Sequence, residues 1–454
     1  MEMLTRRAWL ATAAATVLSG GCARLSLAAL PTVVGTKVAL SIYIMDGTPL
    51  RKLTRMQKFL LDTAHHLAPH ARVTIAAGDG TLPLAWFPPP PVTVLLDPSS
   101  LYRDDPSISM PDIVLCSHSI LPNKLAVRAL DLAPYVKTDQ GDFEGISGTV
   151  IREGLANCPQ RGTVQAGLPL LRIPMVAFVG DGIDPLPGGR PWTTVEFEAT
   201  LARLMPTMKP GMPLISVELR RLFGPAAVGS GGTLARTLER GCTATFGQAP
   251  ALASVADVAG WIRYAYMPIA NFPTRKYGVL IDYLSTFFTS GPELGISWRW
   301  RVGPCPAFTQ TLAVATDNID LMVFRHTAHP QAATSLAAAL LSAPVQEAMT
   351  DAPGLPVRAG AATDYLKRTR NAQRVVGASY LADPSHDVTW QDAYGGTESP
   401  ANVTAVGAVQ QALRDALEPL LGAYAYRDAP TPEGVPAHAE IMSALQQAQS
   451  QVNG

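Results

Sequence analysis

The sequence predicts an α/β protein made of two lobes. Its 454 residues exceed the usual length of a single domain, so two units are expected. Hydrophobic residues make up 47% of the chain, which is enough for a large core. Strand-like and helix-like segments alternate from residue 38 onward. Such alternation is typical of parallel sheets that are covered by helices.

The first predicted elements form a strand–helix–strand unit. Residues 38–44 are an apolar run rich in β-formers, and the run ends at a turn formed by Asp46 and Gly47. Apolar residues then recur every three or four positions between residues 53 and 67, which is the spacing of an amphipathic helix. Residues 72–77 predict the next strand.

The same pattern continues along the chain. A strand is predicted over residues 112–116 and a short helix over residues 122–130. Further strand-like runs occupy residues 175–179, 312–315 and 321–324.

The remaining segments predict loops and a helical C-terminus. Residues 182–191 are rich in proline and glycine and read as a connector to a helix that starts near Thr193. Residues 224–232 predict a glycine-rich loop. From residue 402 onward, helical spacing predicts a pair of helices joined through residues 430–436.

Residues 1–22 predict an export signal. Arg6 and Arg7 precede an apolar run of about ten residues, which is too short to span a bilayer stably. The paired arginines resemble a twin-arginine signal, and the small residues before Cys22 resemble a lipoprotein cleavage box. Lipidation at Cys22 and ordinary cleavage near Ala28 both stay open. Residues 23–36 read as a linker, and we expect the mature protein to work outside the cytoplasm.

The charge balance argues against polyanionic partners. Lysine and arginine number 36, and aspartate and glutamate also number 36, so no overall field attracts nucleic acid or an anionic membrane. Beyond the signal, every apolar run is shorter than the roughly 20 residues of a membrane span. We therefore expect a soluble protein, held to a membrane at most by an N-terminal lipid.

Cysteine and histidine patterns predict no metal site. Cys116, Cys158, Cys242 and Cys305 are widely spaced, and both disulfides and buried free thiols are compatible with an exported chain. The histidines lack the glutamate or cysteine companions of the usual zinc motifs. No nucleophile motif is present either, so we expect no metal, no cofactor and no catalytic residue.

Four blocks, in this order, resemble one known family. They are PDIV (111–114) with LDLAPYV (130–136), GLPLLRIPMVAF (167–178), PWTTVEF (191–197), and the stretch from 323 to 358 that includes HPQAA, LSAPVQ and GLPVR. Together they resemble the extracellular solute-binding proteins of carbohydrate-type ABC importers (family 1). The segment 241–295 departs from the family pattern, as does Gly180-Asp181 after the second block.

The resemblance implies a periplasmic-binding-protein-like fold, with two α/β lobes, a hinge and an interlobar cleft. It places residues 37–172 with 310–356 in lobe one, and residues 173–309 with 357–454 in lobe two. The chain would cross between lobes near residues 172–176. A cleft of this kind closes around a small solute at little conformational cost.

The ligand contacts implied by this fold lie at the carboxyl ends of strands, where open α/β sheets bind ligands. The candidates are Asp46, Ser117, His118, Asp181, Trp298 and Trp300. Aromatic faces stack on sugar rings, and carboxylates bind hydroxyls. Alternation along a strand would put both tryptophan rings on one face. The other interpretations are a core strand face for the tryptophans, turn-capping aspartates and a structural histidine.

The leading hypothesis is a monomeric, non-enzymatic binding protein that captures a small polar solute, for which a saccharide is the expected class, and delivers it to the membrane subunits of an ABC importer. A secreted carbohydrate-acting hydrolase is an alternative, because scattered carboxylates cannot be paired from sequence. An exported sensor or adaptor with the same fold is a second alternative.

Overall fold

The structure is a computed structural model of the whole chain. It describes residues 39–44, 62–64, 72–77, 85–87, 111–117, 125–138, 143, 145–158, 161–180, 183, 189–207, 214–217, 219–238, 241–264, 266–267, 278–285, 300–308, 312–349, 352–369, 372–388, 390–395, 400–422 and 437–454. The export signal, the linker and most of the expected helix over residues 53–67 lie outside these residues.

One large mixed sheet runs through the described part of the chain. Its 12 strands follow the path β11-β8-β12-β7-β14-β4-β1-β2-β3, with β13 and β15 paired to β7 and β16 paired to β14. The strands are β1 (Ala39–Ile44), β2 (Arg72–Ala77), β3 (Ala85–Phe87), β4 (Ile113–Ser117), β7 (Leu168–Gly180), β8 (Ile215–Val217), β11 (Tyr266–Met267), β12 (Val279–Tyr283), β13 (Trp300–Pro304), β14 (Val314–Val323), β15 (Leu355–Pro356) and β16 (Asp387–Val388).

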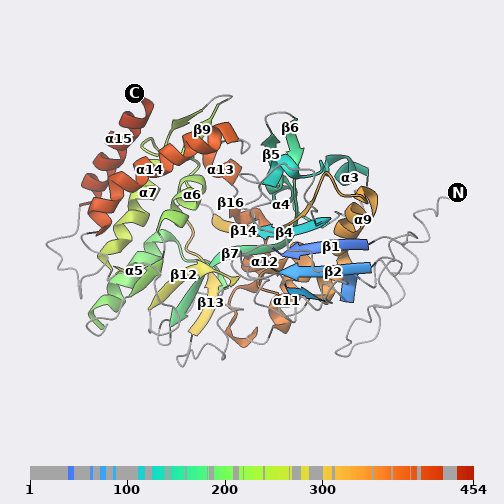
Figure 1. Cartoon of the computed structure of the whole chain (residues 1–454). Coiled ribbons are helices and arrows are strands. Elements are labelled where there is room, and N and C mark those ends of the chain that lie inside the picture. The colour runs from blue at the N-terminus through green and yellow to red at the C-terminus, as the bar shows by residue number, and fades with distance from the viewer. Residues whose placement is uncertain are drawn as a thin grey trace.

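The parallel part of this sheet confirms the predicted α/β class. Strand β1 pairs in parallel with both β2 and β4, and β8 pairs in parallel with β11 and β12. Strands β7 and β14 are antiparallel to their neighbours β4 and β12 and to each other. The two central strands therefore run between two groups of parallel strands (Figure 1).

Helices and small hairpins surround the sheet at both ends. Near β1 and β2 lie η5 (Ala126–Arg128), α3 (Ala133–Thr138), α4 (Gly148–Glu153), the hairpin β5 (Leu155–Cys158) with β6 (Gly162–Gln165), α9 (Pro330–Leu340), α10 (Ala343–Ala348), α11 (Ala359–Arg368), η10 (Ala372–Arg374), α12 (Ala378–Ala382) and η11 (Pro384–His386). The other end holds α5 (Thr194–Leu204), η7 (Met205–Thr207), α6 (Arg220–Gly229), the hairpin β9 (Ala235–Thr237) with β10 (Cys242–Ala244), α7 (Ala251–Gly260), η8 (Trp261–Arg263), α13 (Trp390–Tyr394), α14 (Pro400–Gly422) and α15 (His438–Asn453). Figure 1 shows these two groups on either side of β7 and β14.

Two large hydrophobic cores correspond to the two groups. The first core joins β1, β4, the start of β7 and helices α9 to α12. The second core joins α5, α6, α7, β8, α14 and α15. On one face of the sheet the first core reaches further, because Phe178, Leu280 and Trp300 pack with it rather than with the second core. We call the two groups of elements the first and second lobe.

The packing also bears on where the chain returns to the second lobe. Tyr365, Leu366, Leu381 and Ala382 belong to the first core, and the second core resumes at Val388. This packing favours a boundary between residues 382 and 388, later than the expected 356/357.

Local sequence explains several element boundaries. Helix α5 begins where it was expected, because Thr193 accepts a hydrogen bond from the Glu196 amide while the Glu196 carboxylate accepts one from the Thr193 amide. This capping box satisfies two amides at the helix start that would otherwise lack partners. The predicted C-terminal pair of helices is also present as α14 and α15.

Two local predictions were wrong. The expected loop over residues 224–232 is mostly helix α6, which contains Pro225. Leu222, Phe223 and Ala226 are at most 2% exposed, so burial of an apolar face outweighs the poor helix propensity of Gly224 and Pro225. The two expected strands over residues 312–315 and 321–324 are one strand, β14, which continues through the polar residues between them.

Candidate functional site

The candidate site lies where β7 and β14 pass between the lobes. All 13 residues of β7 are buried. Its first half pairs with β14, and its second half pairs with β12 and β13. Strand β7 therefore belongs to both lobes in one continuous stretch of backbone.

The carboxyl end of β4 opens onto this junction. Ser117 is the last residue of β4 and pairs with Ile319 of β14. Its hydroxyl donates to the carboxylate of Asp317, with Oγ–Oδ distances of 2.9 and 2.8 Å. Asp317 is half-buried, whereas Ser117 is only 6% exposed. The first lobe therefore presents a carboxylate at the edge where parallel α/β sheets usually bind ligands.

Asp317 was not predicted from the sequence, although the sequence of β14 carries a signal. Thr316, Asp317, Asn318 and Asp320 place four polar residues inside β14. Both side-chain atoms of Asn318 are buried without a hydrogen-bond partner among the described residues. A run of polar residues between two strand-like segments costs stability in a core strand. Polar residues at these positions of β14 therefore indicate a functional site rather than core packing.

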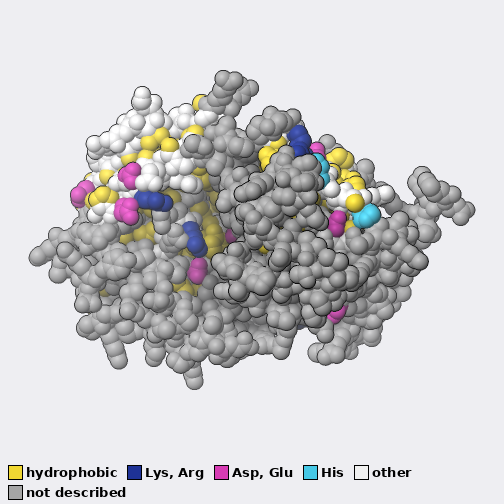
Figure 2. Space-filling model, in the orientation of Figure 1, with side chains coloured by type: hydrophobic (Ala, Val, Ile, Leu, Met, Phe, Trp, Pro, Cys, Tyr) yellow, Lys and Arg dark blue, Asp and Glu magenta, His cyan; other side chains and the backbone are white. Residues whose placement is uncertain are grey.

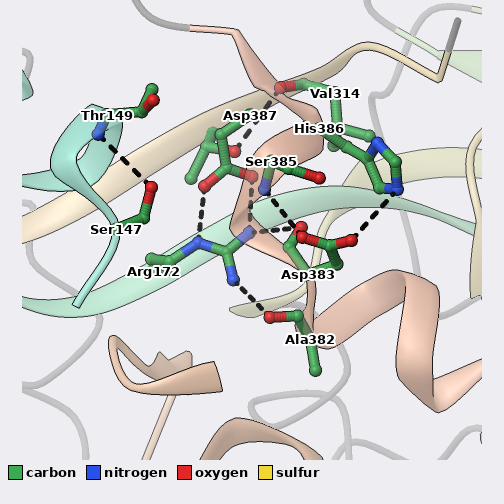
Figure 3. Close-up of polar contacts among 10 residues, drawn as sticks. Ser147, Thr149, Arg172, Val314, Ala382, Asp383, Ser385, His386 and Asp387 are labelled. Atoms are coloured by element: carbon green, nitrogen blue, oxygen red, sulfur yellow. Dashed lines mark hydrogen bonds and ion pairs between the residues drawn. The ribbon is translucent and has the colours of Figure 1, made fainter. Parts of the chain in front are cut away.

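A second polar cluster lies at the same junction and is drawn in Figure 3. The Arg172 guanidinium on β7 donates from Nε and Nη2 to the two carboxylate oxygens of Asp387, each at 2.5 Å. Nη1 also donates to the Ala382 carbonyl at 3.1 Å. The side chains of Arg172 and Asp387 are 1% and 2% exposed, so this is a fully buried bidentate ion pair.

A water-sized cavity of about 10 Å³ borders this ion pair. It is lined by Arg172, Pro174, Met175, Pro304, Leu312, Val314, Tyr380, Leu381, Asp383, His386 and Asp387. The pKa of the Asp383 carboxyl group is lowered. Burial alone would raise this pKa, but hydrogen bonds from Ser385 and the charges of His386 and Arg172 have the larger effect. The carboxylate of Asp383 lies 3.6 Å from the His386 Nε2 atom.

Trp300 and Ser117 are the two predicted ligand residues that the structure describes, and they do not lie together. Trp300 is 5% exposed and packs edge-to-face on Phe178, with ring centroids 5.5 Å apart. The Arg374 guanidinium lies over its ring, 4.6 Å from the centroid. Arg301, the next residue, is exposed, as strand alternation requires. This geometry favours the core-packing interpretation of Trp300.

The other predicted positions lie outside the described residues. They are Asp46, His118, Asp181 and Trp298 in the expected ligand set, and Cys22 as the expected lipidation site. Their roles stay predictions.

The four described cysteines are free thiols. Cys116, Cys158 and Cys305 are buried, and Cys242 is half-buried. Burial raises the pKa of the Cys116 thiol, and the charges of Asp320 and Asp317 raise it further. Within the described ranges, no three His, Cys, Asp or Glu side chains gather closely enough to hold a metal ion.

The charged side chains of the surface and the apolar character of the helices bear on the partners of the protein. On the face drawn in Figure 2, the coloured Lys, Arg, Asp and Glu side chains lie scattered among apolar and uncharged atoms. None of the helices that the structure describes combines the length and the apolar character needed to cross a bilayer.

Comparison with solved structures identifies the fold. The chain is similar to a cyclic α-maltosyl-1,6-maltose binding protein from Arthrobacter globiformis, with 15% identity, 92% of this chain and 99% of that chain covered, and a TM-score of 0.63. An ABC substrate-binding protein from Listeria monocytogenes in complex with cycloalternan matches with 12% identity over 92% and 98% of the two chains and a TM-score of 0.61.

A third similar structure is UgpB from Mycobacterium tuberculosis in complex with glycerophosphocholine, with 13% identity, 91% and 97% of the two chains covered, and a TM-score of 0.61. No family model and no curated protein matches the sequence. The chain therefore has the two-lobe periplasmic-binding-protein fold, as the sequence resemblance predicted.

Proposed function

We propose that the protein is an extracytoplasmic solute-binding protein that captures a small polar solute, of the saccharide class, between its lobes and delivers it to an ABC importer. The carrying observation is the placement of the half-buried Asp317 and its donor Ser117 at the carboxyl end of β4, beside the strands that join the lobes. One protein of the same fold is named for the cyclic maltosyl saccharide that it binds, and another is in complex with cycloalternan, which supports the choice of solute class.

Asp317 suits a hydroxyl-rich solute. A carboxylate accepts up to about four hydrogen bonds, so it can serve a solute hydroxyl as well as Ser117. Its half-buried position strengthens such charge-assisted hydrogen bonds relative to bulk water. The Ser117 hydroxyl fixes the carboxylate orientation before binding, which lowers the ordering cost of recognition.

The remaining parts of the proposal follow from the sequence. Residues 1–22 act as the export signal, the mature chain is a monomer, and Cys22 carries a lipid if the cleavage box is used. The solute itself is the least constrained part, because a glycerophosphocholine complex has the same fold as the saccharide complexes.

The test is a thermal-shift screen of the full mature chain against linear and cyclic glucans and glycerophosphocholine, followed by calorimetry. We expect one saccharide class to stabilise the protein. Asp317→Asn should then weaken binding by about 10- to 150-fold, the equivalent of one hydrogen bond to a charged group. The control is Asp364→Asn on α11, whose side chain is 64% exposed and which should bind normally. Stabilisation by no polar solute, or unchanged affinity in Asp317→Asn, would contradict the proposal.

A further inference from the structure

Within the described residues, three segments, which we call passages, connect the first lobe to the second, and all three come together near Arg172. On β7, Met175 is the first residue that packs in the second core, although Val176 and Phe178, on the other face of the strand, still pack with the first core. On β14, Val314 belongs to the second core and Ile319 to the first. The third passage runs from Ala382 to Val388. The cavity beside Arg172 is lined by residues from each of these passages.

Arg172 connects the first passage to the third through its side chain. Besides the bidentate pair with Asp387, it binds the carbonyl of Ala382, so one guanidinium holds both ends of the third passage (Figure 3). Through its backbone, Arg172 also pairs with Asn318 of β14 and Leu355 of β15. Asp387 in turn pairs with Val314 at the start of β14.

A buried ion pair adds little net stability to a folded protein. Removing two charges from water costs several kcal/mol for each ion, and apolar residues of similar volume are often as stabilising. What a bidentate pair adds is a fixed geometry, because the planar guanidinium matches the carboxylate at only one orientation. At this junction, that geometry fixes how the third passage lies against β7.

We propose that the Arg172–Asp387 pair is a positioning element of the hinge: it fastens the third interlobe passage to the first, so that the lobes turn about one axis and the unliganded protein samples a narrow range of interlobe angles. The small cavity that borders the pair shows that the packing beside it is incomplete. Breaking the pair frees the third passage to move independently of β7.

The test replaces the pair by apolar residues, Arg172→Met with Asp387→Leu, which removes both charges and leaves neither buried alone. The matched control makes the same two replacements at the exposed pair Lys367 and Asp364, as Lys367→Met with Asp364→Leu; these side chains are 65% and 64% exposed. Both double variants should fold. Solution X-ray scattering of the unliganded proteins should show a broader distribution of shapes only for the Arg172/Asp387 variant, and hydrogen exchange should accelerate over residues 382–388.

Ligand affinity is a second readout, and only this one rests on the proposed function. With the best saccharide of the screen, the Arg172/Asp387 variant should bind about 2- to 30-fold more weakly, which is the usual coupling of a residue outside the binding site. If no saccharide binds the wild type, the proposed function fails and the scattering result still decides the hinge proposal.

Three outcomes overturn the hinge proposal. One is a folded Arg172/Asp387 variant whose scattering and exchange match those of wild type and control. The second is equal broadening in the exposed-pair control. The third is failure of the double variant to fold, which would show that the pair is needed for folding rather than for positioning.

Discussion

Gly377 lies close to another backbone segment near the lobe junction, and its substitution by alanine tests the packing there. It precedes α12 with a φ of +69°, in the left-handed region. A Cβ atom at this position would lie 2.0 Å from the Gly189 carbonyl oxygen and 3.2 Å from Cδ of Pro304. The carbonyl belongs to the backbone, so relief of the clash requires the two segments to move apart.

The expected cost of Gly377→Ala has two parts. The left-handed conformation costs about 1–2 kcal/mol for a residue with a Cβ atom. Overpacking against a backbone atom adds about 1–3 kcal/mol. The sum is about 2–5 kcal/mol. With an unfolding entropy of roughly 2.1 cal/mol/K per residue, a 454-residue chain that unfolds as one unit should lose about 2–5 °C in Tm.

The measurement is thermal unfolding followed by circular dichroism, with Gly407→Ala as the control. Gly407 lies exposed in the interior of α14, and a Cβ atom there meets nothing within 4 Å. Alanine should stabilise that helix by about 0.5–1 kcal/mol. Opposite signs for the two variants are expected. A Gly377→Ala protein as stable as wild type would refute the close approach of residues 189 and 377.

Three further predictions concern thiols, pH and a helix cap. In the native protein at about pH 8, Cys116 should resist a thiol-specific disulfide reagent and Cys242 should react slowly, because burial raises both pKa values; rapid modification of Cys116 would contradict its burial. The hydrogen bond from Arg190 lowers the pKa of Glu196 from 4.5 to about 2. Its stabilising effect is therefore complete above pH 4.5 and lost as the pH falls toward 2, so the Tm difference between wild type and Glu196→Gln should shrink across that window; a constant difference would disprove the ion pair. Thr193→Ala should cost about 1 kcal/mol in urea unfolding through loss of the α5 cap, and no change would show that the capping box is dispensable.

The parallel strands were predictable because their signal is local. The runs that become β1, β2 and β4 are short and consist mostly of aliphatic, aromatic or β-branched residues. Strands of parallel sheets that are buried on both faces appear in the sequence as nearly continuous apolar runs, as β4 does. The start of α5 was predictable for a similar reason, since Thr193 and Glu196 carry the complete capping box in four residues.

Helix α6 was not predictable, because its stability comes from partners distant in the chain. Gly224 and Pro225 are poor helix residues, yet Gly224 lets α6 approach α13 so closely that an added Cβ would lie 3.3 Å from the Ala393 side chain. Local propensity is worth about 1 kcal/mol for glycine, and burial of a single large apolar side chain is worth more. This contact joins positions about 170 residues apart, and no window of local sequence contains it.

The junction between the lobes shows why a functional site is harder to predict than the fold that carries it. Arg172 and Asp387 lie 215 positions apart in the sequence. Taken separately, neither residue differs in the sequence from an ordinary charged residue of the surface. Their pairing depends on β7 and β16 both lying against β14. The polar run within β14 was the one local sign, because a strand that keeps Asp317 and Asn318 in a buried sheet violates the pattern that built its neighbours. A polar run in a buried strand therefore indicates where a site lies but not which other residues form it. Here the sheet topology places Ser117 of β4 on one side of β14 and Arg172 of β7 on the other.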